Sequence, residues 1–315
     1  MKLSELFKYA IETGMKNDPR GETGVKRVLE DAKKEYEKLD ESRHWEFDQE
    51  RLWNPYDDSR ILVSNGDPEV ERMLMGINID SAEVLLADRL REKGEKVDLV
   101  VGHHPRGTAM PGLHKVMDIQ VDFYEDWGIP VNIGEQLMEP RMREVMRAVM
   151  PRNHQQAVDT ANLLGIPFIC THSPADIMVH TYLQDYIDKA NPYRLGDVVS
   201  TLKEIPEYRN ATMLKNGPNV VVGNEKQRCG KVIVKMAGGT GPPKTVYEAL
   251  EDAGVGTMVC MHIPEDHIEV AKKHHINVVI AGHMPSDSIG MNLLYKELEE
   301  KGKLEIVRMS GLIGP

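Results

Sequence analysis

Residues 73–105 read MLMGINIDSAEVLLADRLREKGEKVDLVVGHHP, and this stretch decides the fold. Both of its ends are apolar runs, and between them Asp80 and Glu83 match the capping box that begins a helix. Gly94 ends that helix before the second apolar run. A strand, a helix and a strand of these lengths form a βαβ unit, which places the two strands parallel in one sheet. The sequence therefore predicts an α/β fold.

The same alternation returns over residues 231–282, as three apolar runs separated by two helical patterns. It weakens between residues 195 and 230, where proline and glycine interrupt it. Near the start, residues 25–41 carry an amphipathic stripe typical of a helix. We predict two α/β lobes with mixed or parallel sheets flanked by helices, at residues 56–200 and 201–315, after a helical N-terminal extension at residues 1–55.

The composition argues against several functional classes. The chain has 315 residues, with 39 Lys and Arg against 50 Asp and Glu and a formal net charge of −11, so nucleic acid is not an expected partner. There is no apolar run of about 18 residues and no signal-peptide pattern, which predicts a cytoplasmic protein without membrane contact. The three cysteines are widely spaced, so a disulfide framework or a cysteine zinc site has no support.

Histidines follow the ends of four predicted strands, each with a proline directly after it or one residue later. Because the carboxyl ends of parallel strands border one crevice, these side chains are expected to converge. Histidine and carboxylate groups without cysteine suit divalent ions such as Zn, Mn, Fe or Ni. A single strand-end histidine is usually structural, but the joint pattern predicts a metal site. The motifs are His103-His104-Pro105 and three His-x-Pro-x-Asp segments, His172/Asp176, His262/Asp266 and His283/Asp287.

Helices are predicted to begin near Asp176 and at Asp287.

Other patterns have a structural interpretation. The pair His274 and His275 follows two lysines in the last turn of a predicted helix, where cations complement the helix dipole. Methionines that recur every four residues predict a soft core stripe on one helix, at Met138, Met142, Met146 and Met150.

The loop MAGGTGPPKT at residues 236–245 lies between a predicted strand and a predicted helix. It is not a P-loop, because Pro243 stands where the glycine before the lysine is needed and removes a backbone N–H. Its backbone amides could hold an anion, although packing is the simpler role.

Taken together and in this order, these segments resemble the Nif-three-like family, named after the Ngg-one-interacting factor three. The matching stretches cover most of the chain from about Arg60 onward, while residues 1–55 lie outside them. They are residues 75–90 with the following DLVVGHHP, CTHSPAD, MAGGTG with its helix, and VVIAGHMPSD. The resemblance implies two related α/β lobes around a dinuclear metal centre that lies between them, assembled as a toroidal homohexamer.

Carried onto this chain, the resemblance implies two divalent ions and five metal ligands. The last ligand is usually glutamate in the family, and Asp287 is shorter by one methylene, which leaves open whether it bridges both metals. His262 stands where the family often has a glycine turn. It could be an extra metal ligand, a partner of a ligand, or a residue without a role at the site. The five ligands are His103, His104, Asp176, His283 and Asp287.

The leading hypothesis is a metal-dependent hydrolase that acts on a small-molecule substrate through a water bridging the two metals. The bond cleaved would be a phosphoester, a nucleotide bond or a cyclic amide or amidine, since some family members are labelled GTP cyclohydrolase-like. His172 and His262 are the candidate general acid and base, because histidine titrates near neutral pH. The alternative is a non-enzymatic metal-binding adaptor or metal-handling protein. The family name favours this alternative, because it refers to an interacting factor.

Overall fold

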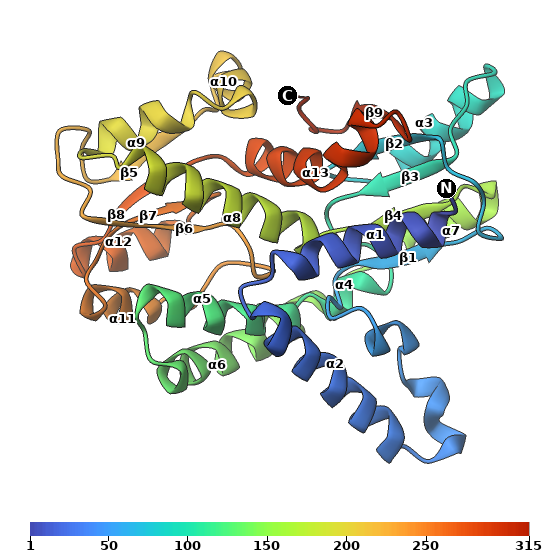
Figure 1. Cartoon of the computed structure of the whole chain (residues 1–315), viewed down its shortest axis with the longest axis horizontal. Coiled ribbons are helices and arrows are strands. Elements are labelled where there is room, and N and C mark those ends of the chain that lie inside the picture. Colours follow the sequence, from blue (N-terminus) through green and yellow to red (C-terminus); the bar gives the residue numbers. More distant parts are fainter. Residues whose placement is uncertain (315) are drawn as a thin grey trace.

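The computed structural model describes residues 1–314, which form two β-sheets flanked by helices (Figure 1). The first sheet has the order β1-β4-β3-β2-β9, and all its strands except the edge strand β1 are parallel. The second has the order β5-β8-β7-β6, with β5 antiparallel at one edge. The predicted α/β class with mixed sheets is confirmed. The strands are β1 (Arg60–Val63), β2 (Arg72–Gly76), β3 (Leu99–Gly102), β4 (Phe168–Cys170), β5 (Asn219–Val222), β6 (Lys231–Lys235), β7 (Val255–Cys260), β8 (Asn277–Ile280) and β9 (Glu305–Met309).

Helices account for most of the remaining described residues. None of them is long and apolar enough to cross a membrane, and the predicted cytoplasmic location stays a prediction. The α-helices are α1 (Leu3–Lys16), α2 (Gly21–Lys38), α3 (Ser81–Glu92), α4 (Ala109–Gly112), α5 (Ile119–Trp127), α6 (Val131–Val149), α7 (Gln156–Leu164), α8 (Ser173–Ala190), α9 (Leu195–Leu202), α10 (Pro206–Met213), α11 (Val246–Asp252), α12 (Glu265–Lys273) and α13 (His283–Glu300). Three 3-10 helices are η1 (Glu41–Glu46), η2 (Gln49–Leu52) and η3 (Val116–Asp118).

The predicted βαβ unit is present as β2, α3 and β3. Asp80 caps α3, and its backbone N–H donates to Glu83 Oε2 at 2.9 Å, which completes the capping box. Gly94 follows the helix with a φ of +85°, a left-handed conformation that costs glycine little. β2 and β3 then pair in parallel, with Met75 opposite Val101. The capping box and the glycine that ends the helix thus correctly predicted this part of the sheet.

Helices α8 and α13 pack against each other across the middle of the molecule (Figure 1). Each follows the end of a parallel strand, α8 after β4 in the first sheet and α13 after β8 in the second. Their contact is close, because a Cβ added to Gly290 of α13 would lie 2.4 Å from the carbonyl oxygen of Ala175 in α8. The two helix N-termini, and the residues on them, are therefore held in a fixed relation.

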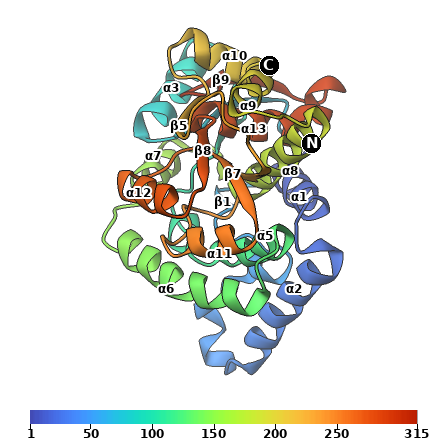
Figure 2. The ribbon, with the colours of Figure 1, turned by 90° about the vertical axis from the view of Figure 1, so that its left-hand side faces the viewer.

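The two ends of the chain pack beside this centre. Helix α1 buries an apolar face that includes Leu6 and Phe7 and packs against α8 and α13, whereas α2 extends away from the sheets (Figure 2). Strand β9 returns to the first sheet and pairs with β2. The predicted boundaries at residues 55 and 200 stay a prediction.

Three local expectations are wrong. Helix α8 begins at Ser173 rather than near Asp176, and α13 begins at His283 rather than at Asp287. A proline in the first turn is compatible with an earlier start, because the N–H it lacks has no partner within the helix. The methionine stripe of α6 is also only partly in the core: Met138 is buried, but Met150 is 72% exposed beyond the helix end.

Candidate metal centre

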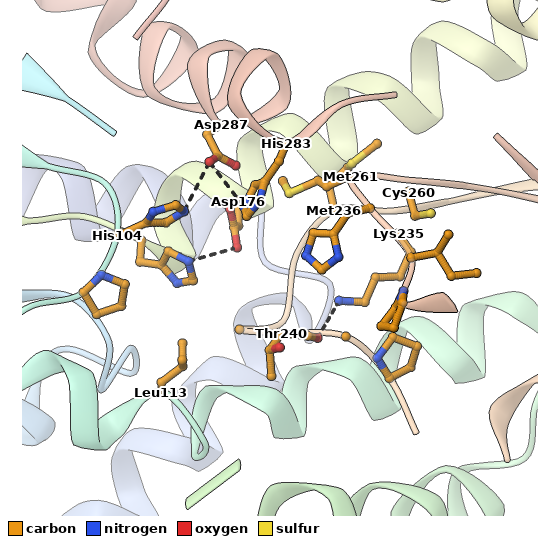
Figure 3. Close-up of a pocket in the computed structure, with 18 of the residues that line it drawn as sticks. His104, Leu113, Asp176, Lys235, Met236, Thr240, Cys260, Met261, His283 and Asp287 are labelled. Atoms are coloured by element: carbon orange, nitrogen blue, oxygen red, sulfur yellow. Dashed lines mark hydrogen bonds and ion pairs between the residues drawn. The ribbon is translucent and has the colours of Figure 1, made fainter. Parts of the chain in front are cut away.

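Side chains from three of the histidine motifs meet where α8 and α13 begin (Figure 3). They come from both sheets: one pair follows β3, one histidine follows β4, and one follows β8. Helix α8 begins directly after His172, and α13 begins at His283. Each histidine therefore lies one helical turn before an aspartate, at positions i and i+4. The converging residues are His103, His104, His172, Asp176, His283 and Asp287.

Imidazole and carboxylate atoms face each other at metal-ligand spacing. The Nε2 of His103 lies 3.4 Å from Asp176 Oδ1 and 3.7 Å from Asp287 Oδ1. The Nε2 atoms of His104 and His283 lie 3.3 and 3.4 Å from Asp287 Oδ2. Two ligands about 2.1 Å from one ion, at a tetrahedral angle, would lie about 3.4 Å apart. This spacing fits donors arranged around cations better than it fits direct hydrogen bonds.

The donor atoms fall into groups whose members lie within 4.8 Å of one another. Asp287 belongs to two of them: Oδ1 is the oxygen nearer His103, and Oδ2 is the oxygen nearer His104 and His283. The shorter side chain of aspartate therefore still reaches both sides of the cluster. The groups are His103 with Asp176 and Asp287, His104 with His283 and Asp287, and His103 with His104 and His172.

The other ring nitrogen of three histidines is already occupied. Nδ1 of His104 lies 2.7 Å from Asn78 Oδ1, and Nδ1 of His172 lies 2.7 Å from Asp58 Oδ2. His103 Nδ1 lies 3.3 Å from the carbonyl oxygen of Thr171. A metal-binding histidine commonly donates from its second nitrogen in this way, which fixes its tautomer and leaves the first nitrogen free as a ligand.

Several atoms of the cluster are buried and have no hydrogen-bond partner. They include His103 Nε2, Asp176 Oδ1 and both carboxylate oxygens of Asp287. A buried carboxylate without a partner is costly, and native proteins rarely leave one uncompensated. Divalent cations would supply the missing interactions, so the residues present fit a metal centre.

Burial and charge shift the pKa values of the cluster. Burial lowers the pKa of His103 well below its usual value. Burial would also lower the pKa of His172, but the carboxylates of Asp176 and Asp58 outweigh it and raise that pKa to about 9. Burial raises the pKa of Asp176. Metal binding at His172 would therefore release a proton.

A cavity of about 390 Å³ adjoins the cluster and is lined by His104, Asp176, His283 and Asp287. His262 also lines it, with its ring centroid 5.0 Å from that of His283, although it lies outside the three donor groups. Burial lowers the pKa of His262, and the nearby ammonium of Lys235 lowers it further. The carboxylate of the same motif, Asp266, pairs instead with Lys244 on the surface.

Two residues that hold the cluster in place could not be recognised in the sequence. Asp58 is fully buried before β1 and accepts from Ser173 Oγ at 2.7 Å in addition to its contact with His172. Asn78 lies between β2 and α3, inside the stretch that decides the fold, but no motif marks it. Conversely, His274 pairs with Glu251 at 2.9 Å, away from the cavity, as its structural interpretation predicted.

No protein-family profile and no curated protein matches the sequence. Among solved structures, a NIF3 superfamily protein from Sphaerobacter thermophilus superposes with a TM-score of 0.75 at 26% sequence identity, over 99% of both chains. The chain has the fold of the NIF3 superfamily. The family resemblance predicted from the sequence is thus confirmed, and it extends to the first 55 residues, which the sequence motifs left outside.

Two further structures overlap more loosely with this NIF3-like chain. Reduced HcgD from Methanocaldococcus jannaschii has a TM-score of 0.49 at 12% identity and covers 79% of this chain and 87% of its own. A protein from Thermus thermophilus, TTHA1606, has a TM-score of 0.48 at 16% identity and covers 83% of this chain and 91% of its own.

Proposed function

We propose that the cluster binds two divalent metal ions. Asp287 would be shared, because its two oxygens face different histidines. The observation that carries the proposal is the set of imidazoles whose Nδ1 atoms are held by other groups while their Nε2 atoms face buried carboxylates. One ion would be held by His103 and Asp176 and the other by His104 and His283, with Asp287 shared and His172 beside His103 and His104.

His172 is better assigned as a ligand than as the general acid or base expected from the sequence. Its Nδ1 is hydrogen-bonded to the buried carboxylate of Asp58, which leaves Nε2 as the nitrogen that can bind a metal; Nε2 lies 3.8 Å from Asp176 Oδ2, and His172 belongs to a donor group with His103 and His104. A carboxylate behind an imidazole also strengthens it as a ligand. His262, which lines the cavity without belonging to a donor group, stays the candidate acid or base.

We further propose that the protein is a hydrolase for a small-molecule phosphoester, nucleotide or cyclic amide or amidine. A bound metal pair would supply an acidified water and would polarise substrate oxygens. The chain's own part is to orient the substrate in the adjoining cavity, to limit water there and to exchange a proton at His262. The cavity volume lies in the range common for small-molecule sites.

Metal content and turnover test this proposal together. Reconstituted protein is expected to hold about two ions per chain by elemental analysis, with anomalous scattering in a crystal reporting their identity and ligands. His104→Ala should lose part of the metal, and Asp176→Ala should lose turnover in a phosphoester and nucleotide panel. Less than one ion per chain, with no change in His104→Ala, would overturn the metal centre.

Metal binding without turnover across the panel would instead favour an adaptor or metal-handling protein. The homohexamer implied by the family resemblance is a separate proposal and rests on that resemblance alone. Light scattering of the purified chain measures it directly, and a monomeric mass at micromolar concentration would contradict it.

A further inference from the structure

Lys235 is a buried cation that the proposed metal chemistry does not use. It is the last residue of β6, only 8% exposed, and it lines the same cavity as Asp176 and His262. In Figure 3 its side chain extends into the cavity from the side opposite His104 and Asp287. The cavity therefore has the proposed metal centre on one wall and an ammonium group on another.

The ammonium of Lys235 has no carboxylate partner among the described residues. Its Nζ donates to the carbonyl oxygens of Ala237 and Thr240, each at 2.9 Å, and an ammonium has a third N–H to give. Burial lowers the pKa of Lys235 to about 8, which still leaves the group mainly protonated at neutral pH. No carboxylate of residues 1–314 lies within ion-pair distance of Lys235, and the more distant charge of Asp176 offsets only part of the cost of burial, which points to an anion that comes from outside the chain.

The turn that holds Lys235 is itself held firmly. Gln120 Nε2 donates to the carbonyl oxygens of Gly238 and Thr240, the latter shared with Lys235. Gly238 has a φ of +96°, and a Cβ there would lie 2.4 Å from Gln120 Cγ, so only glycine fits this packing. The ammonium is thus positioned before any ligand arrives, which lowers the entropy cost of binding.

We propose that Lys235 binds a phosphate group of the substrate, beside the metal centre. This inference rests on the proposed function and narrows its substrate class to phosphate-bearing small molecules, phosphate monoesters or nucleotides. A phosphate has enough oxygens to reach an ammonium and a metal pair together, and lysine binds phosphate as a compact point charge.

The experiment measures binding of inorganic phosphate by calorimetry to metal-loaded and metal-free protein. Lys235→Met is expected to weaken phosphate binding at least tenfold while keeping the metal content, and Lys235→Arg should keep most of the affinity. Lys244→Met is the matched control, a half-exposed lysine in the next part of the loop that pairs with Asp266, and it should change nothing. Acetate is expected to bind far more weakly than phosphate in wild type.

Equal phosphate affinity in wild type and Lys235→Met, at equal metal content, would overturn the proposal and leave the metal centre intact. If wild type holds no metal but binds phosphate in a Lys235-dependent way, the metal centre fails and the phosphate site stands. If Lys235→Met does not fold, a phosphate soak into wild-type crystals decides: phosphate oxygen within hydrogen-bond distance of Lys235 Nζ supports the site, and phosphate bound only elsewhere overturns it.

Discussion

Two buried polar clusters in this protein differ in how their hydrogen bonds are satisfied. Around Arg60, which is 3% exposed, every guanidinium nitrogen donates: to Asp48, to Asp57, and to two backbone carbonyl oxygens, at 2.6–2.7 Å. The one buried atom without a hydrogen bond there is Glu50 Oε2, 3.8 Å from Arg60 Nε, and burial raises the pKa of Glu50 to about 7. The His/Asp cluster instead leaves imidazole nitrogens and carboxylate oxygens without partners.

The difference separates structure from function. Removing one partner from a cluster whose charges are paired within the chain destabilises the fold, because it leaves buried groups uncompensated. A cluster that leaves buried polar atoms without partners in the chain can be completed by a bound ligand. We therefore expect the stability of the Arg60 cluster to depend on mutation alone, and that of the His/Asp cluster to depend on bound metal.

The largest expected effect is that of metal on the His/Asp cluster. With free metal about a thousandfold above its Kd, wild type should gain about 4 kcal/mol in free energy of unfolding, because only the folded state binds. Asp287→Asn, nearly the same size, should lose most of that gain. Chemical denaturation with and without a chelator measures both, and an undiminished gain in Asp287→Asn would contradict the shared role of Asp287.

Arg60→Met should cost about 3 kcal/mol in free energy of unfolding, because it leaves buried acceptors without their donor. The metal content per folded chain should stay as in wild type, as measured by elemental analysis. Arg43→Met is the control, since it removes an exposed pair with Glu46 and should cost less than about 1 kcal/mol. A loss of metal equal to that of His104→Ala would erase the distinction between the clusters.

Asn78→Ala should weaken metal binding about tenfold, equivalent to about 1.4 kcal/mol, since His104 would lose the partner that orients its ring. Competition with a metal-binding dye measures the affinity. Asn65→Ala is the control, an exposed asparagine bonded to the carbonyl oxygen of Gly165 far from the cluster. Equal affinities in the two variants would mean that His104 does not need its orienting bond.

The smallest effect is expected for the second histidine pair of the sequence. His274→Gln removes a peripheral contact with Glu251 and should change the free energy of unfolding by less than about 1 kcal/mol, with no change in metal affinity. The same assays apply. A drop in metal affinity would show that motif context does not separate ligating histidines from structural ones.

Much of the fold follows from short-range patterns. Asp80 and Glu83 begin α3 because a capping box needs only four neighbouring residues, and the βαβ unit then makes β2 and β3 parallel. The return of β9 to the first sheet has no such signal, since its pairing with β2 joins residues more than 230 positions apart. The predicted core stripe on α6 failed for a related reason: which helix face is covered depends on its neighbours.

For the candidate site, the sequence by itself determined the donors. His172/Asp176 and His283/Asp287 are one helical turn apart, and a strand-end position already predicts that histidines will gather at one edge of a sheet. The partners that complete the site were decided by tertiary structure alone. The packing of both sheets around α8 and α13 brings Asp58 to the cluster and Lys235 to the cavity beside it. Local geometry can be read from spacing, but a contact between residues 114 positions apart, as between Asp58 and His172, exists only once the whole core has packed.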